Sequence, residues 1–132
     1  MASTVIKSVR AKTLPEIRID ESVDIFHNWL RAIPCECHAF EFANELLCKQ
    51  YRSVIGRVLR LKNQEQEWYV DGDTELGEIC RYRSIEAKRR FLKLVRDSVE
   101  MLSGDEQLAD EVVCDTGHLL DGSINELRLM GE

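Results

Sequence analysis

The longest regular pattern of apolar residues in this chain runs from Cys35 to Lys62 and has the period of a single helix. Successive apolar residues lie three or four positions apart, which places their side chains on one helical face. The members of this stripe are Phe40, Ala43, Leu47, Tyr51, Val54, Val58 and Leu61. Further apolar residues beside the stripe widen it, so we expect the helix to pack against more than one neighbour.

Upstream of this helix, the pattern predicts an extended arm and one short helix. Leu14-Pro15 interrupts any helix, because proline disfavours the helical conformation of the residue before it. The next residues, Ile17–Asp20, alternate between apolar and polar as a short strand does. We therefore expect residues 1–16 to form a flexible arm. A short helix, capped by Asp20 or Ser22, then extends to Ile33.

Downstream, polar residues separate the long helix from the next helical region. Asn63–Thr74 contains polar and turn-forming residues, with Trp68-Tyr69-Val70 in the middle as a loop plug or a short strand. Thr74 is a suitable cap for a helical pattern that continues to Ser103. The apolar phase is irregular near residues 81–84, which predicts a kink or a break there.

The last helical region begins after Asp105, which is a good N-cap residue. Gly117 and Gly122 interrupt its apolar pattern, so two short helices are an alternative to a single long one. Because helices joined by short loops tend to be antiparallel, we expect the long helix to pair with the helix of residues 84–103. Together the patterns predict an all-α antiparallel bundle of four to five helices with one long central helix, and at most a minor short strand pair.

The size and composition of the chain indicate one folded domain, residues 1–132. Hydrophobic residues make up 44% and charged residues 32%, which is typical of neither a disordered nor a membrane-embedded chain. No apolar run approaches the ~20 residues of a membrane span, and the first residues lack the pattern of a signal peptide. Five cysteines without a disulfide-like spacing favour reduced thiols in the cytoplasm.

The net charge of −6 is unevenly distributed. Residues 49–96 contain 12 basic and 7 acidic side chains, whereas residues 97–132 contain 1 basic and 10 acidic ones. One interpretation is internal, with the acidic C-terminal segment lying against the basic middle. The other is that one of these charged faces binds a partner.

A dense group of metal-ligand residue types occurs at Cys35-Glu36-Cys37-His38. Thiolate and imidazole bind zinc, but a structural zinc site needs a second ligand pair at a matched spacing, and the sequence shows none. Cys48, Cys80 and Cys114 fit apolar helical faces, where cysteine acts as a small hydrophobic residue. We therefore expect no metal and no cofactor, and an enzyme built on residues 35–38 is the least favoured hypothesis.

The clearest positive signal for binding is the basic segment 81–96. Its candidate contact residues are Arg81, Arg83, Lys88, Arg89, Lys93 and Arg96. Such a segment suits the phosphates of a nucleic acid or an acidic protein surface. The acidic character of the whole chain argues against a dedicated nucleic-acid binder.

These observations predict a small non-enzymatic regulatory protein that binds and inhibits or adapts a larger protein through a helical face. The apolar candidates for this contact lie on the long helix, which is also expected to form a homodimer. They are Phe40, Leu47, Tyr51, Val54 and Val58. The alternative is a regulator that binds nucleic acid through the basic helix 81–96.

Overall fold

A computed structural model describes residues 11–35 and 38–131, and these residues form four helices. They are α2 (Leu14–Arg31), α3 (His38–Val70), α4 (Thr74–Ser103) and α5 (Glu106–Met130). The prediction of an all-α bundle is confirmed, and the described residues contain no strand. The predicted strand pair is therefore wrong, since Ile17 and Ile19 lie in α2 and Trp68–Val70 is the last turn of α3.

Helix α2 begins at Leu14, earlier than the sequence pattern predicted. The Thr13 hydroxyl accepts a hydrogen bond from the Glu16 N–H, and the Glu16 carboxylate accepts one from the Thr13 N–H, each at 3.3 Å. This reciprocal capping box starts the helix, and Pro15 fits its first turn, where the missing N–H has no intrahelical partner. Residues 14–16 of the expected arm are therefore helical, whereas residues 1–10 lie outside the described part of the chain.

Helix α3 continues to Val70 instead of ending near Lys62. The polar segment that follows Lys62 was predicted to be a break, but its glutamines and glutamates are good helix formers on an exposed surface. The chain turns only at residues 71–73, where Gly72 has a φ of 83° that suits glycine. The Asp73 carboxylate then caps α4 by accepting a hydrogen bond from the Leu76 N–H at 3.1 Å.

Helices α4 and α5 are each continuous. The predicted break near residues 81–84 is wrong, because α4 continues through them from Thr74 to Ser103. Ser84 is buried within the helix, and its hydroxyl donates to the Arg81 carbonyl at 2.8 Å. Gly117 and Gly122 lie inside α5 without ending it. The predicted cap of α5 is confirmed, since the Asp105 carboxylate accepts a hydrogen bond from the Leu108 N–H at 3.0 Å.

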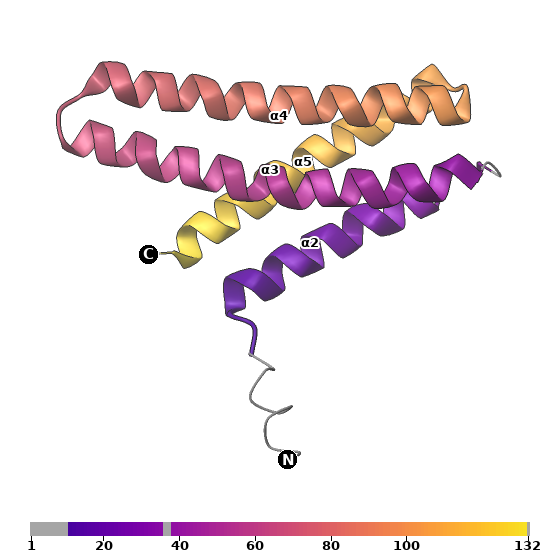
Figure 1. The fold of residues 1–132 in the computed structure, drawn as a ribbon, viewed down its shortest axis with the longest axis horizontal. Coiled ribbons are helices and arrows are strands. Elements are labelled where there is room, and N and C mark those ends of the chain that lie inside the picture. Colours follow the sequence, from indigo (N-terminus) through magenta and orange to yellow (C-terminus); the bar gives the residue numbers. More distant parts are fainter. Residues whose placement is uncertain (1–10, 36–37, 132) are drawn as a thin grey trace, which may run out of the picture.

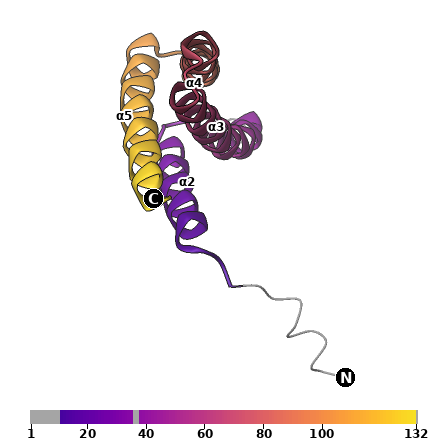
Figure 2. The ribbon, with the colours of Figure 1, turned by 90° about the vertical axis from the view of Figure 1, so that its left-hand side faces the viewer.

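Helices α3 and α4 form a long antiparallel hairpin, and α2 and α5 lie side by side along one part of it (Figures 1 and 2). The end of the hairpin that contains the α3–α4 turn projects beyond the start of α2 and the end of α5 (Figure 1). We call residues 63–85 the distal hairpin. The hairpin thus has one part packed into the bundle and one part without covering helices.

An aromatic cluster lies at the centre of the bundle. Phe26 of α2 stacks on Tyr51 of α3 with ring centroids 4.8 Å apart, and Phe91 of α4 meets both rings edge-on at 5.9 and 5.7 Å. The Ser22 hydroxyl is hydrogen-bonded to the Tyr51 hydroxyl at 2.6 Å and to the Ser123 hydroxyl at 2.7 Å. These contacts tie α2, α3 and α5 together, and burial raises the pKa of Tyr51 although both serines oppose the rise.

Candidate functional site

The five apolar candidates on the long helix are core residues of this chain. Each is at most 8% exposed, and Tyr51 and Val58 are completely buried. The residues concerned are Phe40, Leu47, Tyr51, Val54 and Val58. They pack against the other helices of the same chain, so this fold does not present them to a partner or to a second copy. Binding and self-association therefore need other side chains.

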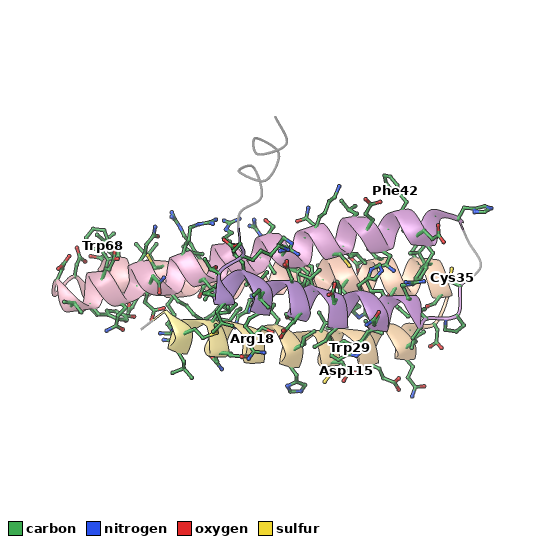
Figure 3. All side chains as sticks on the ribbon, turned by 90° about the horizontal axis from the view of Figure 1, so that it is seen from below. Arg18, Trp29, Cys35, Phe42, Trp68 and Asp115 are labelled. Carbon is green, nitrogen blue, oxygen red and sulfur yellow. The ribbon has the colours of Figure 1, made fainter. Side chains whose placement is uncertain are left out.

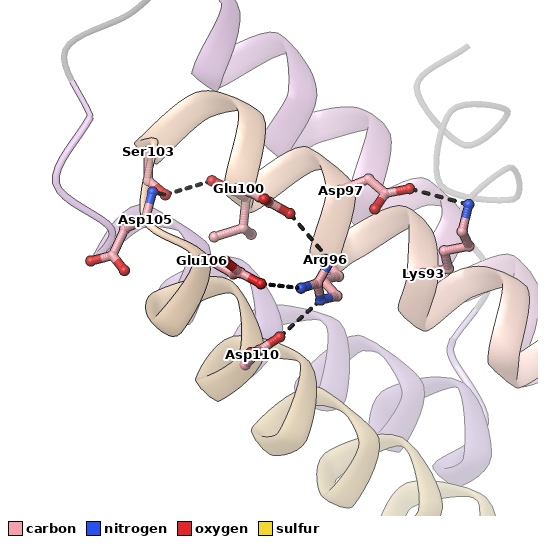
Figure 4. Close-up of polar contacts among 9 residues, drawn as sticks. Lys93, Arg96, Asp97, Glu100, Ser103, Asp105, Glu106 and Asp110 are labelled. Atoms are coloured by element: carbon pink, nitrogen blue, oxygen red, sulfur yellow. Dashed lines mark hydrogen bonds and ion pairs between the residues drawn. The ribbon is translucent and has the colours of Figure 1, made fainter.

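Two of the basic candidates form ion pairs with the acidic helix α5. Lys88 pairs with Asp121 at 3.0 Å. Arg96 is surrounded by three carboxylates, Glu100 at 3.2 Å, Glu106 at 3.3 Å and Asp110 at 2.8 Å (Figure 4). The hydrogen bond to Asp110 is the main cause that raises the pKa of Arg96. The internal interpretation of the charge pattern therefore holds for these residues.

The other basic candidates do not form one continuous patch. Arg89 pairs with Glu86 at 3.6 Å, and Lys93 pairs with Asp97 at 3.5 Å within α4. Arg81 and Arg83 form no ion pair with any described residue, and residues two apart on a helix point in different directions. The ion pairs within α4 reduce the positive charge that Arg89 and Lys93 offer to the phosphates of a nucleic acid.

Four large apolar side chains are exposed on the packed part of the hairpin. Leu46 follows Phe42 by four residues and Met101 follows Leu94 by seven, so each pair shares one side of its helix. Phe42 and Leu46 belong to α3, and Leu94 and Met101 belong to α4. Phe42 points away from α2 and α5 (Figure 3). Between the two helices a shallow groove is lined by Gln50, Ser53, Val54, Arg57, Ala87, Arg90, Phe91 and Leu94. We call Phe42, Leu46, Leu94 and Met101 the outer hairpin face.

The sequence pattern contained a signal for this face. Phe42 and Leu46 are four residues apart, so they share a helical side, and they were among the residues that widened the apolar stripe of the long helix. What the pattern lacked was the position of α2 and α5. Only the packing of these helices distinguishes the covered side of α3 from the open one.

A second groove, of about 950 Å³, lies between α2 and α3. In it Nδ1 of His27 lies 3.1 Å from Oδ1 of Asn44 and 3.5 Å from Sγ of Cys48. Cysteine catalysis needs the thiol and the orienting group on opposite nitrogens of the imidazole, whereas here both approach the same nitrogen. Burial, assisted by the charge of Asp24, raises the pKa of Cys48, which disfavours the thiolate nucleophile.

The predicted absence of a metal site concerned residues 35–38, of which Glu36 and Cys37 lie outside the described residues. The Cys35 thiol donates a hydrogen bond to the Leu102 carbonyl at 3.3 Å. Over residues 11–35 and 38–131, no group of three or more His, Cys, Asp or Glu side chains is arranged to hold a metal ion. None of the described helices has the length and apolar content required to cross a bilayer.

Comparison with known proteins gives no relative from which a role follows. No model of a known protein family, no curated protein and no solved structure matches this chain.

Proposed function

We propose that this protein is a non-enzymatic regulatory protein that binds a larger protein through the outer hairpin face, and so inhibits it or adapts it to another component. The observation that carries the proposal is the group of large apolar side chains on a face that α2 and α5 leave open. Phe42 is 74% exposed there and Met101 is 79% exposed. Contiguous exposed apolar groups on a folded chain commonly mark protein interfaces.

Burial of this face against a partner supplies free energy of binding. Complete removal of a large apolar side chain from water contributes about 1.5–3 kcal/mol. Most of the surface of Phe42 and of Met101 is still exposed to solvent and can be buried by a partner. Methionine adapts its shape to a partner, and an aromatic ring serves as an anchor. The adjoining α3–α4 groove suits an amphipathic helix of the partner.

The charge beside the groove favours a partner that has a carboxylate next to its apolar side chains. Arg57 lines the groove and forms no ion pair with any described residue. Arg90, across the groove, is held by Glu86 at 3.2 Å. A partner carboxylate next to Arg57 would gain a charge-assisted hydrogen bond, which is stronger than one between neutral groups.

Two further observations support a non-enzymatic role in a reducing compartment. Cys35, Cys48, Cys80 and Cys114 are free thiols, which is the usual state of cysteine in the cytoplasm. The geometry at His27 and Cys48 does not provide an activated nucleophile. We therefore place the activity of this protein in binding, and its location in the cytoplasm.

Site-specific photocrosslinking tests the proposal. A photoreactive phenylalanine analogue at position 42 or 101 is expected to capture the same larger protein from a lysate of the source organism. The matched control is position 129 on α5, because Leu129 is 74% exposed but lies outside the outer hairpin face. The captured protein is then purified and its Kd is measured.

The double substitution Phe42→Asp plus Met101→Asp is expected to raise this Kd by at least about 100-fold, because truncation of central apolar anchors commonly costs more than 2 kcal/mol. Leu129→Asp is expected to leave it unchanged. Equal binding by the double variant and the unmodified protein, with both folded by circular dichroism, would refute the proposal.

A further inference from the structure

Charge is sharply segregated along the α3–α4 hairpin. Residues 63–80 contain six acidic side chains and no basic one. The acidic residues are Glu65, Glu67, Asp71, Asp73, Glu75 and Glu78. The next stretch of α4, residues 81–96, contains seven basic side chains and a single acidic one, Glu86. The hairpin is therefore acidic at its projecting end and basic immediately behind it.

The basic part of α4 remains accessible although some of its charges are paired within the helix. The side chains of Arg89, Arg90 and Lys93 are 71%, 76% and 77% exposed. Their carboxylate partners, Glu86 and Asp97, belong to the same helix and cover little of them. Surface ion pairs of this kind are weak, so these cations remain able to bind further carboxylates.

Apolar side chains lie between the acidic and the basic part of α4. Gly77, Cys80 and Ser84 are buried and mark the inner side of the helix. Tyr82 is two residues before Ser84, which corresponds to a rotation of about 200°, so it lies on the outward side. Tyr82 is 66% exposed, and Ile79 and Ile85, at three residues to either side of it, are also exposed. Neither α2 nor α5 covers this part of the hairpin (Figure 1).

We propose that the distal hairpin binds a second copy of this chain, with the two α4 helices packed antiparallel and crossing at Tyr82. In this arrangement Tyr82 meets Tyr82 of the second copy, and Ile79 meets Ile85 of the second copy. Glu75 of each chain then lies opposite Arg89 of the other. The Tyr82 contact lies on the twofold axis and the other contacts each occur twice about it, so the surface is complementary to itself.

The charge pattern selects the antiparallel orientation. A parallel pair of hairpins places acid on acid and base on base, whereas the antiparallel pair places the acidic end of each hairpin over the basic part of the other. Two like-charge pairings remain in this register, Glu78 against Glu86 and Arg81 against Arg83 of the second copy. Arg81 and Arg83 lie about 100° to either side of Tyr82, so they flank the contact. Arg90 lies 3.2 Å from Glu86 in its own chain, which partly offsets the repulsion between the two carboxylates.

The anchors of the proposed function, Phe42 and Met101, are not among the contacts of this dimer, although Arg57 and Arg90 adjoin both surfaces. Light scattering of the full chain at a concentration on the order of 100 μM tests it, since a contact with a Kd of about 10 μM is then mostly formed. The expected mass is that of two chains in low salt. Because charge pairs contribute to the contact, the dimer fraction is expected to fall in 1 M salt, where screening is strong.

Three variants test the orientation and the register. Tyr82→Asp is expected to reduce the mass to that of one chain, because it places two carboxylates at the crossing point. Glu75→Arg alone is expected to raise the dimer Kd by at least about tenfold, because it opposes Arg89 with another cation. Glu75→Arg combined with Arg89→Glu is expected to restore most of the dimer affinity, since opposite charges again face one another.

Leu129→Asp and Met101→Asp are the matched controls, and both are expected to remain dimeric. A monomeric unmodified protein at this concentration would overturn the proposal. So would a dimer that Tyr82→Asp and Glu75→Arg leave intact, because that dimer would use another surface. Failure of the double exchange to recover the dimer, with both chains folded by circular dichroism, would overturn the antiparallel register.

Discussion

At the scale of single residues, the environment of a side chain decides its chemistry more than its type does. Cys48 and Cys114 illustrate this. Cys48 is half-buried beside His27 and Asp24, whereas Cys114 lies exposed on α5. Both cysteines occupied an apolar helical pattern in the sequence, so the pattern alone did not separate them.

Cys48 is expected to react with iodoacetamide more slowly than Cys114 at pH 7.5. Burial and the charge of Asp24 raise the pKa of Cys48, so less of the reactive thiolate is present at this pH. Peptide mass spectrometry at several times of reaction measures both rates, and the unfolded protein serves as the control in which the difference disappears. A faster reaction at Cys48 would mean that His27 stabilises the thiolate.

Gly77 shows how one missing side chain shapes the distal hairpin. A Cβ atom at this position would overlap the ring of Tyr69, which lies directly over the glycine. Gly77 is buried although the surrounding part of the hairpin is exposed. The glycine thus lets the end of α3 pack closely on the start of α4.

The effect of Gly77→Ala on the free energy of unfolding is expected to depend on Tyr69. It is expected to be less favourable by about 1 kcal/mol or more in the unmodified protein than in a Tyr69→Ala background. Alanine stabilises a helix by about 1 kcal/mol relative to glycine, but in the presence of Tyr69 it displaces the ring. Urea unfolding of the four proteins in this double-mutant cycle gives the coupling free energy. Equal effects in the two backgrounds would show that the ring does not need the glycine.

At the scale of helices, local periodicity predicted the existence of each element better than its ends. The apolar stripe that begins at Phe40 and the cap at Asp105 are local features. The stripe lies within α3, and Asp105 is the N-cap of α5. The sequence pattern places the start of α2 too late, because Pro15 breaks the interior of a helix but is accepted in its first turn. The end of α3 was missed because its polar residues pack against no core.

Arg96 is the principal charged link between α4 and α5. Arg96→Gln is expected to lower the free energy of unfolding more than Lys93→Gln. Arg96 bridges to Glu106 and Asp110 of another helix, whereas Lys93 pairs with Asp97 of its own helix and with no other described residue. Urea unfolding in low and high salt measures both effects. The difference is expected to shrink in high salt, where exposed charge pairs are screened, and a difference independent of salt would contradict this account.

At the scale of the whole molecule, the structure divides the α3–α4 hairpin into a packed part and a projecting part. Residues such as Tyr51 and Phe91 lie in a core formed by several helices. In the distal hairpin Asn63 and Gln66 still adjoin α2 and α5, but beyond them α3 and α4 pack mainly on each other. Several apolar side chains are exposed there, among them Trp68 (Figure 3). Both proposed interfaces follow from the sides of the hairpin that α2 and α5 leave uncovered.

Backbone amides of residues 63–80 are expected to exchange with deuterium at least about tenfold faster than those of residues 91–99. Local opening of the distal hairpin disrupts few buried contacts, whereas opening near Phe91 disrupts the core. Hydrogen exchange measured by mass spectrometry tests this at a dilution where any dimer dissociates. Equal protection of the two segments would show that the hairpin opens as one cooperative unit.

The sequence by itself determined the class of fold and the segments that form helices, because periodicity, capping and turn residues act over short distances along the chain. Tertiary structure alone decided which apolar residues are core and which are surface. Phe40 and Phe42 are two positions apart on the same helix, yet one is 8% exposed and the other 74%. The physical reason is that burial depends on where α2 and α5 lie, and the local periodicity of α3 and α4 does not show on which side these helices pack.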